Sequence, residues 1–444
     1  MLQRLREFGD RPAVVWHDQP LTYRQLADRI DSWRKRLDES GILAGDVCAV
    51  VGDQSVEVCA ALLALLDRKA IAVPLCSLSP AQHERCFEIA SVAAVIAETE
   101  GAWTIRRRSA GPVPGLLSQL RSAGAPGLVL FSSGSTGDPK AALWNAERLI
   151  EKHRDSQRSF RTLAFLRLDH IGGLNTLFRT LCAGGCLIVS AERDPESVCR
   201  AVERHRIELL PTTPTFLKML LISRAAERFD VSSLRLVTYG TEPMAAGVLR
   251  DLCAALPKVE FKQTYGLSEL GILPTKSRQR DSLWLKLGGP GYETRIVNGV
   301  LWVRTALAML GYLNHSSPFD ADGWFNTQDA VEVDGEFVRI LGRTSEIINV
   351  GGEKVYPAEV EAVLTQADNV AAAAVFGRRN PIMGQVVMAR VALLADEPDA
   401  ERRLIAFCRE RLAPHRVPML IEVAQGPLHS ERGKIIRREG PHGG

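Results

Sequence analysis

The chain has 444 residues, of which 46% are hydrophobic and 24% are charged. This length and composition exclude a small disulfide-bonded scaffold, a fibrous protein and a disordered chain, and they leave room for several folded domains. The formal net charge is only +3, so the bulk charge predicts neither a nucleic-acid partner nor another polyanion.

The nine cysteines predict a protein without disulfide bonds, because their number is odd and several lie within apolar runs. There is no CxxC pair, and Cys182 and Cys186 flank two glycines without a neighbouring histidine, so we expect no zinc site. The sequence shows neither an apolar leader segment nor a run long enough to span a membrane. Reduced cysteines are typical of the cytoplasm, where we therefore expect the protein to be found.

The first half of the chain alternates short apolar runs with longer helix-like segments. Val47–Val51, Val56–Leu66 and Ala70–Leu75 follow one another as strand, helix and strand. The same rhythm returns later, with strands expected at 128–131, 186–190 and 234–239 and a helix at 195–205. This alternation predicts an α/β fold with layered sheets.

Two hairpins then predict a β-rich subdomain. Strands 293–297 and 300–305 flank Asn298-Gly299, and strands 330–333 and 336–341 flank Asp334-Gly335. A polar stretch follows Arg343, and we place the domain boundary there. We expect a large N-terminal domain over residues 1–343 and a small α+β C-terminal domain over residues 344–444.

The C-terminal domain is expected to alternate helices and strands. Its predicted elements are a helix at 357–366, strands at 370–376 and 385–394, a helix at 400–412 and a strand at 420–423. A domain of this size is suited to act as a lid.

A loop rich in hydroxyl groups and glycines follows the buried strand at 128–131. Glycines allow backbone N–H groups to turn toward an anion, hydroxyls add neutral donors, and a lysine supplies positive charge, so the loop suits a polyphosphate. It is not a Walker A motif, because Pro139 precedes the lysine and Ala141 follows it. A flexible Ser/Gly linker is the alternative. The candidate residues are Ser132, Ser133, Gly134, Ser135, Thr136, Gly137 and Lys140.

This loop and a second block, 263–269, resemble the adenylate-forming superfamily of acyl-CoA synthetases, peptide-synthetase adenylation domains and luciferases. The second block is similar to the family's Tyr-Gly-x-Thr-Glu motif, in which Ser268 stands where threonine is usual. Tyr265 can stack on a purine beside Gly266, Ser268 can donate to a phosphate, and Glu269 can hold Mg²⁺. Taken alone, Ser268 and Glu269 are also typical of a helix start.

Later blocks extend the resemblance almost to the end of the chain. The segment 322–329 is similar to the family block whose aspartate binds the ribose of ATP, which assigns that role to Asp329 and places Gln328 where glycine is usual. The segment 341–357 resembles the hinge block. The resemblance implies an ATP-binding role for Arg343, a hinge at Ser345, a thiol-acceptor face at Gly351 and Gly352, and the catalytic lysine of adenylate formation at Lys434.

The segment 166–174 resembles the family block beside the acid-binding pocket. His170 is expected to line or gate this pocket, although a lone histidine is more often structural. Ile171 stands where peptide synthetases place an aspartate for the α-amino group, which indicates an acid that is not an α-amino acid. The expected acyl pocket comprises His170, Ile171, Gly172, Gly173, Tyr239, Gly266 and Leu267.

The segment Gly240-Thr241-Glu242 replaces the usual Gly-Gly-Ala beside the adenine. Its Glu-Pro pair resembles the corresponding segment of fatty-acyl-AMP ligases. This resemblance weakens the assignment of CoA as acceptor. The resemblance as a whole implies an enzyme that uses ATP and Mg²⁺ to convert a small-molecule carboxylic acid to acyl-AMP, with CoA as the expected second substrate. Two alternatives remain: a ligase that loads the phosphopantetheine of a carrier protein, and a catalytically silent nucleotide-binding regulatory protein.

Overall fold

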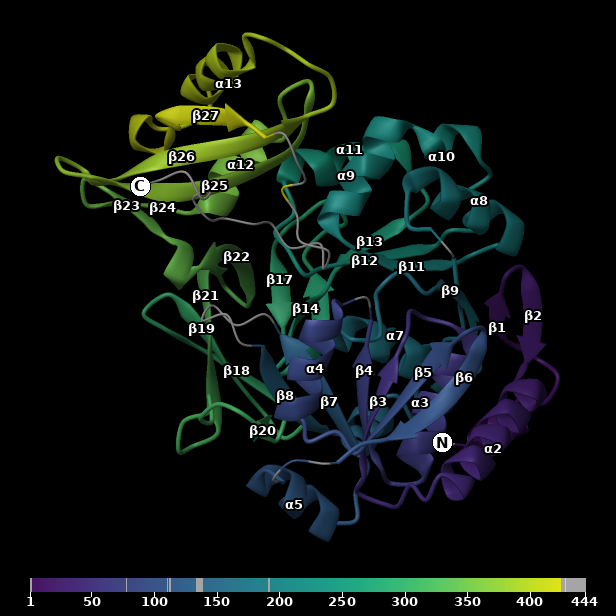
Figure 1. Cartoon of the computed structure of the whole chain (residues 1–444). Helices are drawn as coiled ribbons and strands as arrows, with labels where there is room; N and C mark the ends of the chain where they lie inside the picture. Colours follow the sequence, from purple (N-terminus) through teal and green to yellow (C-terminus); the bar gives the residue numbers. More distant parts are fainter. Residues whose placement is uncertain are drawn as a thin grey trace.

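The computed structural model describes residues 2–76, 78–109, 111, 113–132, 139–190, 192–424 and 428. The chain folds into a large N-terminal domain and a smaller C-terminal domain, which lies at the upper left in Figure 1. The mixed α/β architecture agrees with the sequence prediction.

The first seven-stranded sheet of the N-terminal domain has the order β20-β8-β7-β4-β3-β5-β6. Its strands are β3 (Val47–Val51), β4 (Ile71–Leu75), β5 (Ala94–Thr99), β6 (Ala102–Arg107), β7 (Gly127–Ser132), β8 (Lys140–Asn145) and β20 (Gly311–Tyr312). The central strands β3 and β4 are parallel and almost wholly buried. Strands covered on both faces read as continuous apolar runs, which is why these were readily predicted.

The second seven-stranded sheet has the order β13-β12-β11-β9-β10-β1-β2. Its strands are β1 (Pro12–Trp16), β2 (Gln19–Thr22), β9 (Arg161–Leu163), β10 (Cys186–Ile188), β11 (Leu209–Thr212), β12 (Leu236–Tyr239) and β13 (Glu260–Gln263). Strands β11, β12 and β13 are parallel and in register. Their carboxyl ends therefore lie side by side at one edge of the sheet.

Helices cover both sheets and fill the space between them. The described residues up to Ala255 form the helices α1 (Leu2–Glu7), α2 (Tyr23–Glu39), α3 (Val56–Asp67), α4 (Pro80–Ile89), α5 (Gly115–Ser122), α6 (Ala146–Glu151), α7 (Ile171–Cys182), α8 (Pro195–His205), α9 (Pro214–Ser223), α10 (Ala225–Arg228) and α11 (Ala246–Ala255). Leu62 of α3 and Leu177 of α7 share one buried cluster with Leu130 and Leu187, which belong to different sheets. Thus α3 and α7 form the layer between the sheets, while α8, α9 and α11 cover the far face of the second sheet.

Helix α3 shows why this central layer is stable. Ser55 caps its N-terminus by accepting a hydrogen bond from the N–H of Val58. Ten of its twelve residues are buried, because the helix is apolar all round and has a sheet or another helix on each side.

The β-rich subdomain is a six-stranded antiparallel sheet in the order β16-β17-β22-β21-β19-β18. Its strands are β16 (Thr275–Ser277), β17 (Leu285–Leu287), β18 (Tyr292–Val297), β19 (Val300–Thr305), β21 (Trp324–Asp334) and β22 (Phe337–Arg343), and the short hairpin of β14 (Tyr265–Leu267) and β15 (Gly271–Leu273) precedes it. Both predicted hairpins are confirmed. Asn298 and Gly299 have φ of 53° and 75°, as a tight two-residue turn requires.

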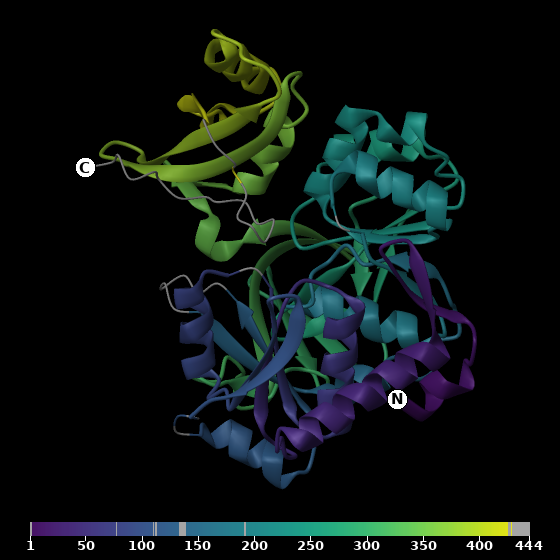
Figure 2. The ribbon, with the colours of Figure 1, turned by 45° about the vertical axis from the view of Figure 1, so that its right-hand side comes forward.

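The C-terminal domain packs α12 (Pro357–Leu364) and α13 (Ala400–Arg409) against a sheet. Its strands are β23 (Ile348–Val350), β24 (Glu353–Val355), β25 (Val370–Asn380), β26 (Gly384–Leu393) and β27 (Leu420–Val423). Strand β25 runs four residues beyond the predicted strand end, since pairing with β26 continues through the polar residues Arg378 and Arg379. Both predicted helices end earlier than expected. Figure 2 shows this domain set above the N-terminal domain.

Two further predictions concern disulfide bonds and membrane spans. All nine cysteines are free thiols, and eight of them are buried. Within the part of the chain that the structure describes, no helix is both long and apolar enough to cross a membrane.

Candidate active site

A cavity of about 250 Å³ opens where the second sheet, the β-rich subdomain and the C-terminal domain meet. It lies at the carboxyl ends of β12 and β13, where ligands bind in open α/β sheets. The cavity brings together eight residues that the sequence predicted for ATP or acid binding: Gly240, Thr241, Glu242, Tyr265, Gly266, Leu267, Asp329 and Arg343.

Asp329 is the best-defined polar group of this cavity. The phenol of Tyr265 donates to its Oδ2 at 2.5 Å, and the Nε of Arg343 lies 2.9 Å from its Oδ1. Burial raises the pKa of Asp329, and Arg343 and Tyr265 oppose this shift. The carboxylate is thus held in one orientation, and the remaining lone pairs of its oxygens can accept hydrogen bonds from a diol.

The backbone beside Asp329 explains the unusual residue before it. Gln328 has φ of 58°, which is the left-handed conformation that glycine adopts readily. Its N–H donates to Oδ1 of Asn326, and the N–H of Asp329 donates to Oγ1 of the fully buried Thr327. The side chains of Asn326 and Thr327 therefore hold the turn, and the shape of the backbone does not depend on glycine.

The segment after β12 approaches the opposite wall very closely. A Cβ at Gly240 would lie 2.5 Å from Oγ1 of Thr264, so a larger residue would not fit there. Thr241 has φ of 73°, which is rare and strained for a β-branched residue. The glycine and the strained threonine both indicate a wall shaped for a bound group.

Glu242, expected beside the adenine, lines the cavity and also bonds to a neighbouring helix. Its carboxylate accepts a hydrogen bond of 2.7 Å from the N–H of Thr215, in the first turn of α9. Burial raises the pKa of Glu242, and the nearby carboxylate of Glu361, on the C-terminal domain, raises it further. Glu242 borders the cavity, but the polar contact of its side chain is with the helix.

Gln263 was not among the predicted site residues, although it lies in a recognised block. It lines the cavity at the end of β13, and its buried Oε1 accepts no hydrogen bond from the residues that the structure describes. A buried unpaired acceptor is costly, so this atom is suited to an N–H donor of a ligand. Its position next to Tyr265 in the sequence was the available signal.

A second group of residues gathers around Tyr312 at the end of β8. The hydroxyl of Tyr312 donates to Oε1 of Glu269, and the ammonium of Lys140 lies 5.6 Å from the centre of the Tyr312 ring. Asn314 clamps the end of the phosphate loop, since its side chain donates to the carbonyl of Pro139 and accepts from the N–H of Ala141. Tyr312 and Asn314 were not predicted, because only the pairing of β20 with β8 brings them here.

The candidate metal ligand Glu269 lies with Ser268 in the turn between β14 and β15, so the helix start considered for these two residues is wrong. In the described residues no group of three or more acidic, histidine or cysteine side chains could hold a metal ion. One carboxylate nevertheless fits Mg²⁺, which commonly takes one or two protein carboxylates and completes its shell with phosphate oxygens and water.

Several predicted site residues lie outside the described residues: Ser133, Gly134, Ser135, Thr136 and Gly137 of the phosphate loop, and Lys434. The described ends of that loop, Ser132 and Lys140, are register partners across the antiparallel strands β7 and β8. The loop therefore connects two paired strands and leaves the sheet at a defined point.

The residues predicted for the acyl pocket lie in different surroundings. His170 is the residue before α7, its side chain is 32% exposed, and its Nε2 lies 3.9 Å from the buried Asp169. Ile171 is buried in the core between the sheets, and Gly173 is required because a Cβ there would lie 2.0 Å from the carbonyl oxygen of Arg167. Tyr239 is also a core residue, because its side chain points to the face covered by α9 and α11. Gly172 remains partly exposed.

The candidate hinge and thiol-acceptor residues lie beyond Arg343. Ser345 is exposed in the single turn of 3₁₀ helix at Thr344–Glu346 that joins β22 to β23. Gly351 and Gly352 form the turn between β23 and β24, with φ of 58° and 91°. Neither glycine lines the cavity, which the C-terminal domain instead reaches through Pro357 and Ala358 at the start of α12.

A half-buried lysine joins the two domains in this arrangement. Nζ of Lys218, on α9, donates to the carbonyl of Val370 at 2.6 Å, and Val370 begins β25 of the C-terminal domain. Burial lowers the pKa of Lys218 to about 8. This hydrogen bond is specific to the present orientation of the domains.

We predict that Lys218→Met loosens the contact between the domains. Losing one charged hydrogen bond while keeping the apolar stem should weaken the contact by about 1.5 to 3 kcal/mol, or roughly 10- to 150-fold in the population of separated domains. The rate of limited proteolysis within residues 344–346 measures this population, with the exposed Lys258→Met as control. An unchanged cleavage rate would show that the Lys218 bond contributes nothing.

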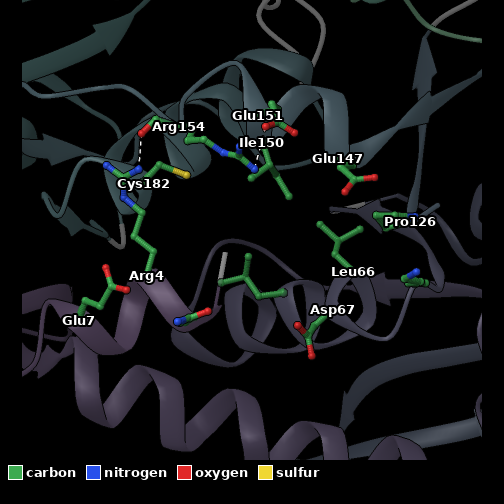
Figure 3. A pocket seen from close by; sticks show the side chains of 13 residues that line it. Arg4, Glu7, Leu66, Asp67, Pro126, Glu147, Ile150, Glu151, Arg154 and Cys182 are labelled. Atoms are coloured by element: carbon green, nitrogen blue, oxygen red, sulfur yellow. Dashed lines mark hydrogen bonds and ion pairs between the residues drawn. The ribbon is translucent and has the colours of Figure 1, made fainter. Parts of the chain in front are cut away.

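A larger hollow of about 580 Å³ lies on the other side of the N-terminal domain, between α1, α3 and α6. Figure 3 shows acidic and basic side chains around it, including Glu7, Asp67 and Arg154, with Arg154 close to Glu151. None of the predicted site residues lines it. Its mixed charge and its lining, which lacks every predicted site residue, give no reason to place the chemistry there.

The comparison with protein families now identifies the class of protein. Residues 2–313 match the model of the AMP-binding enzyme family, and residues 359–434 match that of the AMP-binding enzyme C-terminal domain. The chain belongs to this family, which is a family of enzymes, as the resemblance implied.

Individual relatives and one solved structure agree with this assignment. The chain is 28% identical to the 2-succinylbenzoate–CoA ligase of Bacillus licheniformis, over 98% of each chain. It is also 28% identical to the indoleacetate–CoA ligase of Aromatoleum aromaticum, over 96% of this chain and 93% of the relative. The crystal structure of an anthranilate CoA ligase in complex with anthranoyl-AMP matches with a TM-score of 0.84 and 20% identity, over 98% of this chain and 95% of that one. At this identity the structural match shows the shared fold.

Proposed function

We propose that the protein is an AMP-forming acid–thiol ligase that converts a carboxylic acid without an α-amino group to acyl-AMP and then to its CoA thioester. The observation that carries the proposal is Asp329, fixed by Tyr265 and Arg343 in a cavity at the carboxyl edge of the second sheet. The whole-length similarity to ligases of indoleacetate and 2-succinylbenzoate supports an organic acid as substrate.

In the first half-reaction the residues of this chain position ATP and neutralise charge. Asp329 accepts hydrogen bonds from the ribose hydroxyls, and Oε1 of Gln263 accepts one from the amino group of adenine. Tyr265 packs against the base. Lys140 and the loop before it hold the phosphates. Glu269 would hold Mg²⁺, which would supply further neutralisation of phosphate charge when bound.

The acid carboxylate attacks the α-phosphorus of ATP in line, and the bond to the pyrophosphate oxygen breaks. Lys434 stabilises the charge that develops on the α-phosphate and the attacking carboxylate, while binding of both substrates supplies orientation. The products are acyl-AMP and pyrophosphate.

The second half-reaction requires the C-terminal domain to move. Rotation at Ser345 withdraws Lys434 and turns Gly351 and Gly352 toward the adenylate, where a thiolate attacks the acyl carbon and AMP leaves. The position of the two glycines outside the cavity supports an arrangement suited to the first half-reaction. A carrier protein is the alternative acceptor, but Glu242, the residue that suggested it, is engaged with α9.

The test is acid-dependent pyrophosphate release with ATP and Mg²⁺ over aryl, medium-chain and long-chain acids and amino acids, each with and without CoA. We expect release with one class of non-amino acid, and a CoA thioester where CoA is present. Pyrophosphate release without a CoA product, but with acyl transfer to a phosphopantetheinyl carrier, would show that a carrier protein and not CoA is the acceptor. Release with amino acids alone would contradict the proposed acid class.

A further inference from the structure

Helix α7 presents one accessible line of residues in an otherwise buried layer. Gly172, Asn175 and Arg179 are partly exposed, whereas the other residues from Ile171 to Cys182 are buried. A spacing of three and four residues places these three on one side of a helix. This partly exposed side of α7 begins next to His170 and runs away from the carboxyl ends of β12 and β13, where the cavity lies.

The facing sides of β12 and β13 are accessible as well. Thr238 and Lys262 are register partners and are partly exposed, while Val237 and Phe261, on the opposite face, are buried beneath α9 and α11. The positive charge of Arg179 acts on Lys262, which places the two side chains near each other. Thr264, two residues after Lys262, lines the cavity. Gly172, Asn175 and Arg179 of α7, with Thr238 and Lys262 of the sheet, therefore form a strip of partly exposed residues that starts beside the cavity residue Thr264 and ends at Arg179.

The far end of this strip is rich in positive charge. Arg179 and Lys262 are half-buried, and Lys152 lies nearby, where its Nζ donates to the hydroxyl of Tyr292 at 3.2 Å and to the carbonyl of Ile272. Among the described residues, no carboxylate forms an ion pair with any of these three cations. The acidic group whose charge acts on Lys262 is the exposed Glu260.

His153 and Asn175 lie between the cations. His153 is 7% exposed, and it is hydrogen-bonded to the side chain of Asn175. Burial, together with the charges of Lys152 and Arg179, lowers the pKa of His153 to about 4, so the imidazole is neutral at physiological pH. The group is therefore cationic and polar, with no compensating anion of its own.

The guanidinium of Arg179 lies 5.9 Å from the centre of the Phe160 ring, but this contact supplies no negative charge. A half-buried cation without a counter-charge is costly, because it has lost water without gaining an anion. An anionic ligand group removes that cost, and a guanidinium binds a carboxylate with two parallel hydrogen bonds. The seven residue-to-residue steps from Gly172 to Arg179 rise about 10 Å along the helix. The cationic end thus lies about that far from the region where the reacting carboxylate must be.

We infer that Arg179, assisted by Lys262, binds a second carboxylate at the far end of the acid substrate. The inference rests on the proposed function and narrows its substrate class. The favoured substrates are dicarboxylic acids whose two carboxylates lie about 10 Å apart, on an extended aliphatic chain or across an aromatic ring, and short dicarboxylates do not reach.

The test uses matched pairs of acids in the pyrophosphate-release assay of the intact protein: octanedioate with octanoate, and para-carboxycinnamate with cinnamate. For the unmodified protein we expect kcat/KM at least tenfold higher for the dicarboxylate of a pair. Arg179→Met should raise KM for that dicarboxylate about 10- to 100-fold with little change in kcat, and leave the monocarboxylate within about twofold. Arg250→Met, an exposed change on α11 beyond the opposite face of the sheet, is the matched control and should alter neither.

If Arg179 has only a structural role, Arg179→Met should reduce activity with both acids of a pair. Arg179→Lys, which keeps the charge, should then fail to restore the preference for the dicarboxylate. That result, or an unmodified protein that prefers the monocarboxylates, overturns the inference and leaves the proposed function standing. Absence of pyrophosphate release with every acid of the wider panel contradicts the proposed function itself, and the inference falls with it.

Discussion

Asp329→Ala is expected to raise the KM for ATP by about 10²- to 10³-fold in acid-dependent pyrophosphate release. Hydrogen bonds to a charged group are worth about 1.5 to 3 kcal/mol each, and two ribose hydroxyls would lose such a partner. The carboxylate is 6% exposed and already held by Tyr265 and Arg343, so ATP binds a group that needs no reorganisation.

The matched control is Tyr265→Phe, which removes the hydroxyl that donates to Asp329 and keeps the ring. We expect this variant to raise KM for ATP only severalfold, because Arg343 still orients the carboxylate and the ring still packs against adenine. Thermal unfolding must accompany both measurements, since Asp329→Ala also leaves Arg343 without its partner. An Asp329→Ala protein that stays folded and keeps its KM for ATP would exclude the ribose contact.

Lys434→Ala is expected to slow pyrophosphate release by about 10²- to 10³-fold while thioester formation from supplied acyl-AMP and CoA stays within a few-fold. The lysine is proposed to act only where charge builds up on the α-phosphate, and removal of one preorganised charge-stabilising group costs several kcal/mol at that step. In the proposed second half-reaction the same side chain is withdrawn, so we expect its loss to have little effect there.

The two half-reactions must be measured separately, the first by pyrophosphate release and the second by thioester formation from synthetic acyl-AMP. Lys434→Arg keeps the positive charge with a bulkier head group and should restore part of the first rate. The neighbouring Arg437→Ala serves as control for a general loss of basic charge in the terminal segment. Equal loss of both half-reactions in Lys434→Ala would argue against this division of labour.

Local patterns allowed much of the fold to be predicted. The Asn298-Gly299 turn fixes its hairpin because these two residues adopt positive φ at little cost, and the runs at 47–51 and 71–75 must be buried strands because they are apolar on both faces. Less regular elements were missed. The short strands β14, β15, β23 and β24 have only three residues each, which is too few to show a periodicity, and each pairs with its neighbour in a short hairpin.

The candidate site divides in a similar way. The block containing Tyr265 and that containing Asp329 could each be recognised, but the hydrogen bond between the two residues joins positions 64 apart. Tyr312 reaches Glu269 only through the pairing of β20 with β8, and a lone Gly-Tyr in the sequence gave no sign of that. Tyr239 was expected at the acyl pocket, yet the alternation of side chains along β12 turns it to the other face.

By itself the sequence determined the class of protein, the order of its motifs and the chemical types of group that each motif offers, because these reside in neighbouring residues. Tertiary structure alone decided which groups meet. It joined Asp329 to Tyr265 and Arg343, bonded Lys218 to the C-terminal domain, and gathered Arg179, Lys262 and Lys152 without a carboxylate partner among the described residues. Ion pairing and burial depend on distances between segments far apart in the chain, and only packing of the sheets and helices sets those distances.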